Sequence, residues 1–153
     1  MKMNLERLRR GVLRFLILDA LNLRPMHVYE IMKTIETRFN GVYKPSPGSI
    51  YPVLKSLIKE GSVTVVEKDG KKVYKLTEDG EQKWAEAKAH VKHFFSNTNY
   101  RRLASELFDL SLVLYNYRSK LEKPEVFHDV DLVLMECRKK IEMILEDHNK
   151  EVS

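Results

Sequence analysis

Cysteine, glycine, proline and long apolar runs are all scarce in this chain of 153 residues. A single Cys excludes an intramolecular disulfide and any zinc site built on several cysteines. The six Gly and five Pro are too few for a collagenous or low-complexity chain. No apolar run approaches the roughly 18–20 residues of a membrane-spanning helix. The composition instead indicates a globular protein, because 43% hydrophobic residues are enough for a core.

The first ten residues contain Glu6 and lack the apolar stretch of a secretory signal peptide. One isolated cysteine also fits a reducing compartment. We therefore expect a soluble, cytoplasmic protein without a membrane partner.

Charge is distributed unevenly along the chain. The whole sequence has 27 Lys and Arg against 22 Asp and Glu, a net charge of +5. Residues 1–76 hold 15 basic and 7 acidic side chains, a net charge of +8. Residues 77–153 hold 12 basic and 15 acidic side chains, a net charge of −3. A basic half favours a polyanion as partner, although a solvated lysine-rich surface gives the same counts.

Two helices are expected at the start of the basic half. Apolar residues recur with helical spacing over residues 5–21 and again over residues 26–39. Pro25 separates the two helices, because a proline disfavours helical backbone at the residue before it. Asn40-Gly41 is a typical helix end.

A third helix follows, with clear signals at both ends. Ser46 is expected to cap its first turn, and Pro47 suits the first helical position, where no backbone N–H is needed. Gly61 is a plausible stop. The apolar face of this helix consists of Ile50, Val53, Leu54, Leu57 and Ile58.

The spacing of apolar residues then changes to the alternation of β-strands. Asp69-Gly70 lies between two such stretches and is the strongest short signal for a β-hairpin. The hairpin tip carries Lys68, Lys71 and Lys72. Thr77 is placed to cap a fourth helix.

Three helices followed by a basic hairpin is the plan of a winged helix-turn-helix domain. In that plan the third helix enters a DNA major groove, and the hairpin lysines neutralise phosphates. A helical domain with a merely solvated hairpin tip is the alternative. The basic charge, the order of the elements and the position of the hairpin all favour DNA binding over this alternative.

Four motifs of the basic half resemble, in order, those of the PadR family of transcriptional regulators. They are Gly11–Leu18, Pro25–Ile31, Ser46–Leu57 with Glu60-Gly61, and Tyr74–Gly80. Val28 stands where the family usually has Gly, and Ser62 where an apolar residue is common. The resemblance covers nearly half of the chain and implies a dimeric, usually repressing, DNA-binding regulator.

The resemblance also implies DNA contacts at Tyr29, Ser46, Ser49, Tyr51 and Lys55. Tyr29 is expected to bond a phosphate, the two serines to fix the backbone or touch a base edge, and Tyr51 and Lys55 to lie inside the groove. Packing of the tyrosines in the core and a purely capping role for Ser46 are the alternatives. Lys68, Lys71 and Lys72 complete the predicted DNA-binding set.

The acidic half is expected to be helical over residues 77–96, 100–121 and 125–149. Apolar residues recur at alternating steps of four and three in residues 100–121, and at steps of three and four in residues 125–149, as in a heptad pattern. The predicted dimer interface consists of Leu103, Leu107, Leu110, Leu114, Val130, Val133, Cys137, Ile141 and Ile144. Cys137 is expected to be a small core residue rather than a nucleophile.

These patterns predict a mainly α-helical fold with one small β-hairpin. Residues 1–76 would form a winged helix-turn-helix DNA-binding domain, and residues 77–153 a helical dimerisation region. A basic head of this size cannot cover all of the apolar helical surface, so a second copy of the chain is the expected cover. A helical hairpin folded on a monomer is the alternative.

Neither an enzyme nor a bound cofactor is expected. His90 and His93 lie three residues apart, but no carboxylate or Cys stands at matching spacing, so we predict no metal site. A Gly-rich phosphate loop is also absent from the sequence. Aromatic residues of the helical half could line a site for a small hydrophobic effector, although such residues more often form a core or interface.

The sequence thus predicts a sequence-specific, DNA-binding transcriptional regulator. It would act as a repressor and bind an inverted-repeat operator as a homodimer. Two other classes stay open: a nonspecific DNA-binding architectural protein and a helical protein-interaction adaptor.

Overall fold

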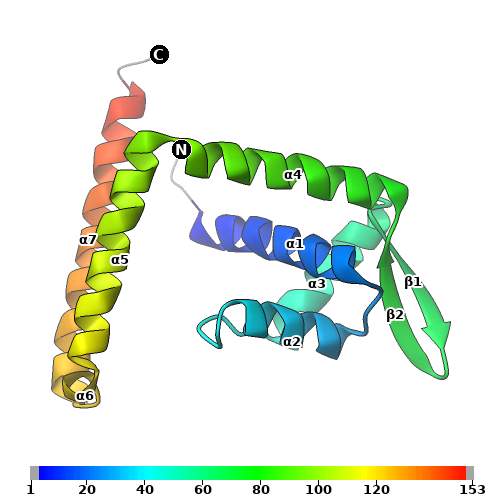
Figure 1. Ribbon diagram of the computed structural model, residues 1–153, viewed down its shortest axis with the longest axis horizontal. Coiled ribbons are helices and arrows are strands. Elements are labelled where there is room, and N and C mark those ends of the chain that lie inside the picture. Colours follow the sequence, from blue (N-terminus) through cyan, green and yellow to red (C-terminus); the bar gives the residue numbers. More distant parts are fainter. Residues whose placement is uncertain (1–3, 151–153) are drawn as a thin grey trace. The chain divides into compact units, whose positions relative to one another are not determined.

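Four helices and one β-hairpin make up the N-terminal part of the computed structural model, which describes residues 4–150 (Figure 1). The elements are α1 (Leu5–Leu23), α2 (Val28–Arg38), α3 (Pro47–Lys59), β1 (Val63–Lys68), β2 (Lys71–Leu76) and α4 (Glu78–Ser96). The hairpin β1–β2 is called the wing below. The predicted fold class is confirmed. Residues 1–3 and 151–153, the ends of the two expected regions, lie outside the described part.

The core of this unit lies between α1, α2, α3 and the base of the wing. The second half of α1 is buried, as its nearly continuous apolar sequence predicts. The buried apolar side chains are Leu13, Leu16, Ile17, Leu18, Ala20, Leu21, Met26, Ile31, Ile35, Ile50, Val53, Leu54, Leu57, Val63, Tyr74 and Leu76. Each fully buried Leu or Ile stabilises the fold by about 1.5–3 kcal/mol.

Helix α2 begins at Val28 rather than at residue 26, because Met26 is paired with the wing. The Met26 N–H donates to the Tyr74 carbonyl at 3.0 Å, and the Tyr74 N–H donates to the Met26 carbonyl at 2.8 Å. Val28, the first departure from the family pattern, packs partly buried against the core. Its extra bulk is thus accommodated by apolar neighbours.

The wing is a regular antiparallel hairpin. Its register runs from Val63 opposite Leu76 to Lys68 opposite Lys71. Asp69 and Gly70 both have positive φ, at 53° and 73°, which is the geometry of a type I′ turn. The predicted hairpin and its turn are therefore both present.

The start of α4 is held tightly against the turn that precedes the wing. The Thr77 hydroxyl accepts the N–H of Gly80 at 3.0 Å, as the sequence predicts for a cap. A Cβ at Gly80 would lie 1.9 Å from the carbonyl oxygen of Ser62, so only Gly fits there. Ser62, the second departure from the family pattern, is fully buried and donates its hydroxyl to Glu60 at 2.7 Å.

The Asp19 carboxylate joins three helices of the N-terminal unit. It pairs with Arg38 of α2, and it accepts the indole N–H of Trp84 of α4 at 3.0 Å. Because α4 is held in this way, the compact unit extends to Phe95. The sequence placed the boundary earlier, after Leu76.

The second unit, Ser96–Ser153, consists of α5 (Thr98–Asn116), α6 (Arg118–Leu121) and α7 (Pro124–Lys150). The single helix expected over residues 100–121 is divided, because the backbone of Tyr117 (φ −103°, ψ 20°) leaves helical geometry. Helices α5 and α7 run in opposite directions, and the short α6 connects them at one end (Figure 1).

The second unit has no interior of its own. None of its described side chains, residues 96–148, is buried. Cys137 is exposed in the single chain, so its expected place in an apolar core at the dimer interface stays a prediction. All nine residues of the predicted interface are exposed or only partly buried.

Candidate nucleic-acid interface

Helix α3 presents a polar face opposite its buried face. Tyr51 and Lys55 are one helical turn apart and both are exposed, Tyr51 to 53%. Ile50, Val53, Leu54 and Leu57 are buried on the other side. Core packing of Tyr51 is thereby ruled out, and its hydroxyl is free to meet solvent or a ligand.

A groove lies between α3 and the wing. It has a volume of about 580 Å³, and its lining residues are Tyr51, Pro52, Leu54, Lys55, Ile58, Val65, Lys72 and Tyr74. Three members of the predicted DNA-binding set, Tyr51, Lys55 and Lys72, therefore share one hollow. Burial raises the pKa of the Tyr74 phenol above its usual value, and Tyr51 nearby acts in the same direction. The Tyr74 phenol stays neutral at physiological pH.

The hydroxyls of Ser46 and Ser49 form a reciprocal cap at the start of α3. The Ser49 N–H donates to the Ser46 hydroxyl at 3.2 Å, and the Ser46 N–H donates to the Ser49 hydroxyl at 3.1 Å. The capping role predicted for Ser46 is thus observed. Each hydroxyl keeps some hydrogen-bonding capacity, so a DNA contact at either serine stays a prediction.

Tyr29 lies in the first turn of α2 and is 73% exposed. Its ring therefore does not pack in the core, which was the alternative to a phosphate contact. The structure does not place Tyr29 among the residues that line the groove between α3 and the wing.

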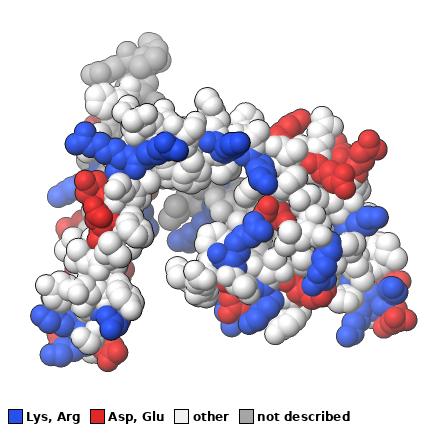
Figure 2. Space-filling model, in the orientation of Figure 1, with Lys and Arg blue, Asp and Glu red and all other residues white. Residues whose placement is uncertain are grey.

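The wing tip carries basic side chains with few partners. Lys68, Lys71 and Lys72 are exposed, and none is in a salt bridge within residues 4–148. Glu67 and Asp69 lie close to them in sequence, and Figure 2 shows basic and acidic side chains together at the wing. The lysines outnumber these acids, which keeps the tip suitable for phosphate contacts.

Comparison with known proteins identifies this domain. Residues 17–86 match the PadR-like family of transcriptional regulators. The N-terminal unit contains a PadR-like domain. The resemblance predicted from the four motifs is confirmed, and the family is one of regulators rather than enzymes.

Sequence relatives support the same assignment. The chain is 47% identical over 77 residues to the transcriptional regulator YqjI of Escherichia coli (strain K12), and equally to an uncharacterised YqjI of Shigella flexneri. The aligned part is 50% of this chain but only 37% of either relative.

Solved structures support the fold. A transcriptional regulator from Clostridium thermocellum superposes with a TM-score of 0.56 at 20% identity, covering 61% of this chain and 96% of its own. A PadR-like transcription factor from Bacteroides fragilis gives 0.54 at 25% identity, covering 62% and 94%.

Two arginines of α1, just before the range that matches the PadR-like family, were not predicted as site residues from the sequence. Arg9 and Arg10 line a hollow of about 600 Å³ beside Gly48 and Ser49 at the start of α3. Arg9 pairs with Glu6 at 2.8 Å. The basic run at residues 7–10 was the available signal, but its position next to α3 depends on the packing of α1 against α3.

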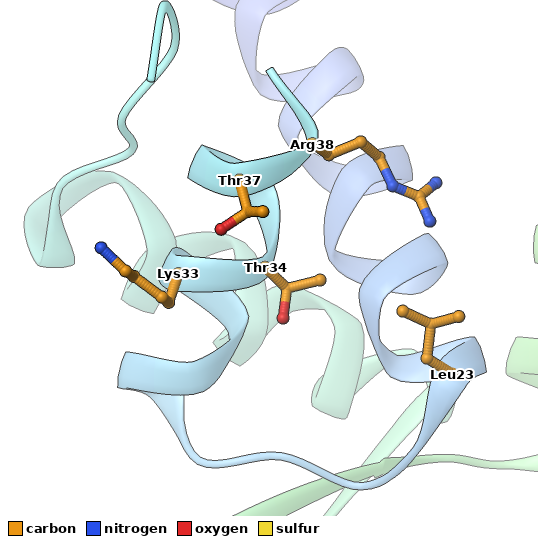
Figure 3. Close-up of a pocket in the computed structure, with 5 residues that line it drawn as sticks. All are labelled: Leu23, Lys33, Thr34, Thr37 and Arg38. Atoms are coloured by element: carbon orange, nitrogen blue, oxygen red, sulfur yellow. The ribbon is translucent and has the colours of Figure 1, made fainter. Parts of the chain in front are cut away.

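A second hollow of the PadR-like domain, about 340 Å³, lies between α1 and α2 (Figure 3). Three of its four polar side chains, all but Thr37, have partners within the domain. Arg38 extends toward α1 and pairs with Asp19, Lys33 pairs with Glu36 at 3.4 Å, and the Thr34 hydroxyl donates to the Met26 sulfur at 3.6 Å. This hollow therefore offers little to an additional polar ligand.

A larger hollow, about 1040 Å³ and mainly apolar, lies between α1 and α4. Val12, Phe15, Val91 and Phe95 are among its lining residues. Trp84, an aromatic residue of the half expected to be helical, is partly buried against the core and does not line this hollow. Binding of a small hydrophobic effector stays a prediction.

Across residues 4–148, no three His, Cys, Asp or Glu side chains are grouped so as to hold a metal ion. Among the described helices, none is both long and apolar enough to cross a membrane.

Proposed function

We propose that this protein is a sequence-specific, DNA-binding transcriptional regulator that acts as a homodimeric repressor. The observation that carries the proposal is the groove between α3 and the wing, where Tyr51, Lys55 and Lys72 meet in a PadR-like domain. A helix with exposed hydrogen-bond donors beside a lysine-bearing hairpin suits the major groove together with the adjacent phosphates.

The second unit supports a homodimer. Helices in globular proteins are stabilised mainly by packing an apolar face, and here no described side chain of α5, α6 or α7 is buried. Leu107 is 61% exposed and Ile144 is 58% exposed. An apolar surface of this extent marks an interface. A second copy of the chain carries the same heptad-spaced surface and is the partner that the proposal requires.

A symmetric dimer of winged helix-turn-helix domains would bind two half-sites arranged as an inverted repeat. Repression follows most directly from such binding, because a protein seated on a promoter blocks access to it. The part of the chain that aligns with its curated relatives spans only 37% of their length, so the activity of those whole proteins is not carried over to this chain.

The test is in vitro selection of DNA fragments that bind the purified chain, at about physiological salt. We expect an inverted repeat to be enriched. Lys55→Ala should abolish the enrichment, whereas Lys59→Ala, on the same helix but outside the groove, should preserve it. Binding without enrichment would favour the architectural protein. No binding by the unaltered chain would contradict the proposal and favour the adaptor, for which charge reversal at Lys55 would have no effect.

A further inference from the structure

The wing of this domain is attached to α2 along one edge. The backbones of Met26 and Tyr74 form an isolated β-bridge at the edge of β2, with hydrogen bonds of 3.0 and 2.8 Å. Because alternate residues of β2 direct their backbone groups to this edge, the Lys72 carbonyl faces the same side as those of Tyr74.

His27 continues this attachment toward the wing tip. Its ring Nδ1 lies 3.0 Å from the Lys72 carbonyl oxygen. A carbonyl only accepts, so Nδ1 carries the proton and donates. Beyond Lys72 come the paired Lys71 and Lys68 and the turn between them, for which no hydrogen bond to another element is recorded within residues 4–148.

The backbone of His27 is itself fixed. Its N–H donates to the Glu30 carboxylate at 2.9 Å, and that carboxylate pairs with Arg24 at 3.0 Å. His27 as a whole is partly buried. The donor at Nδ1 is therefore held in place, not carried on a freely moving side chain.

We propose that His27 is a positioning residue for DNA recognition: its Nδ1 donor holds the outer wing so that Lys71 and Lys72 meet the phosphates while α3 occupies the groove. The inference rests on the proposed function. Lys72 links the two sites, because its carbonyl receives the His27 bond while its side chain lines the groove with Tyr51 and Lys55.

The test compares three proteins on the selected operator across a range of salt concentrations. His27→Phe keeps a ring but removes the donor, and His27→Asn restores a donor nitrogen near the Nδ1 position. We expect His27→Phe to bind about three- to tenfold more weakly at physiological salt. The salt slope, which is the slope of the logarithm of the binding constant against the logarithm of the salt concentration, should fall in magnitude by about one to two units, because each lost phosphate contact removes about one. His27→Asn should recover most of both.

A double-mutant cycle separates positioning from general destabilisation. In a Lys71→Ala, Lys72→Ala background, His27→Phe should have little further effect, because the side chains it positions are gone. The thermal midpoint of each variant, and the exchange rate of the Tyr74 amide hydrogen, report folding and wing attachment without DNA. We expect faster exchange in His27→Phe at a nearly unchanged midpoint.

The measurements distinguish failure of the proposed function from failure of the proposed role of His27. If the unaltered chain binds no DNA, the proposed function falls and this inference falls with it. If the unaltered chain binds but His27→Phe keeps its full salt slope, only the inference is overturned. An equal loss of affinity with and without the two lysines would also overturn it.

Discussion

Single side chains on α3 are expected to carry DNA recognition. Lys55→Ala and Tyr51→Ala each remove an exposed donor from the groove without touching the buried face of the helix. A specific contact to a base is worth about 1–3 kcal/mol, so each variant should lose sequence-specific operator binding. Electrophoretic mobility shift on the selected operator measures this loss.

The matched control for these variants is Lys59→Ala. Lys59 is exposed on the same helix and is not among the residues that line the groove. It should bind the operator like the unaltered chain, and the mass of all three variants in solution should stay that of the unaltered chain. Normal operator binding by Lys55→Ala and Tyr51→Ala would show that the groove is not the recognition surface.

Helical spacing was enough to predict that Tyr51 and Lys55 lie away from the core. It could not predict the partners of Asp19 or His27. The carboxylate of Asp19 meets Trp84 from 65 positions away, and Nδ1 of His27 meets the Lys72 carbonyl from 45 positions away. No local pattern relates residues so distant, because their contacts arise only when α1, α2, α4 and the wing pack together.

At the scale of single elements, the start of α2 should depend on pH through Glu30. The hydrogen bond from the His27 N–H, and then the hydrogen bond and charge of Arg24, hold the pKa of the Glu30 carboxyl below its ordinary value. A lowered pKa in the folded state stabilises the fold above that value, and the stabilisation is lost as pH falls through the folded pKa. Glu30→Gln should therefore be less stable than the unaltered chain near neutral pH.

Urea denaturation at a series of pH values checks this prediction. The stability difference between the two proteins should shrink as the pH falls below the ordinary pKa of a glutamate, because the unfolded chain then takes up a proton at residue 30 before the folded chain does. A difference that stays constant as the pH falls would show that the charge of Glu30 contributes nothing to the start of α2.

The wing is the second element with a measurable role. Replacing both Lys71 and Lys72 by Ala should weaken operator binding and lower its salt slope by about two, since about one unit is lost per phosphate contact. Replacing Lys139 and Lys140, an adjacent exposed pair on α7, provides the control and should leave the slope unchanged. An unchanged slope in the wing variant would mean that the wing does not touch DNA.

Elements with local signals were predicted well, and elements limited by tertiary contacts were not. Ser46-Pro47 and Asp69-Gly70 fix the start of α3 and the wing turn through their own backbone chemistry. The start of α2 was predicted too early because Met26 pairs with Tyr74, which is far along the chain. The end of α5 at Asn116 could not be predicted, because no proline or glycine lies next to it in the sequence.

For the whole molecule, the apolar surface of the second unit requires a partner. The chain should have twice its mass of 18.0 kDa in solution at low micromolar concentration. Ile144→Glu places a charge on the heptad-spaced surface of α7 and should shift the mass to that of a monomer. Lys139→Glu adds the same side chain between the heptad positions and should stay dimeric. Light scattering after size exclusion reads both masses, and a monomeric unaltered chain would end the dimer proposal.

Dimerisation should also decide how the protein reads its operator. Two linked domains bind an inverted repeat far more tightly than one half-site, because the second contact is made at high effective concentration. Ile144→Glu keeps the groove between α3 and the wing and should bind the full operator hardly better than a single half-site. Lys139→Glu should keep the preference for the full repeat. If Ile144→Glu is monomeric and still prefers the full repeat, the two half-sites are not joined through α7, and the surface that pairs the domains lies in the N-terminal unit.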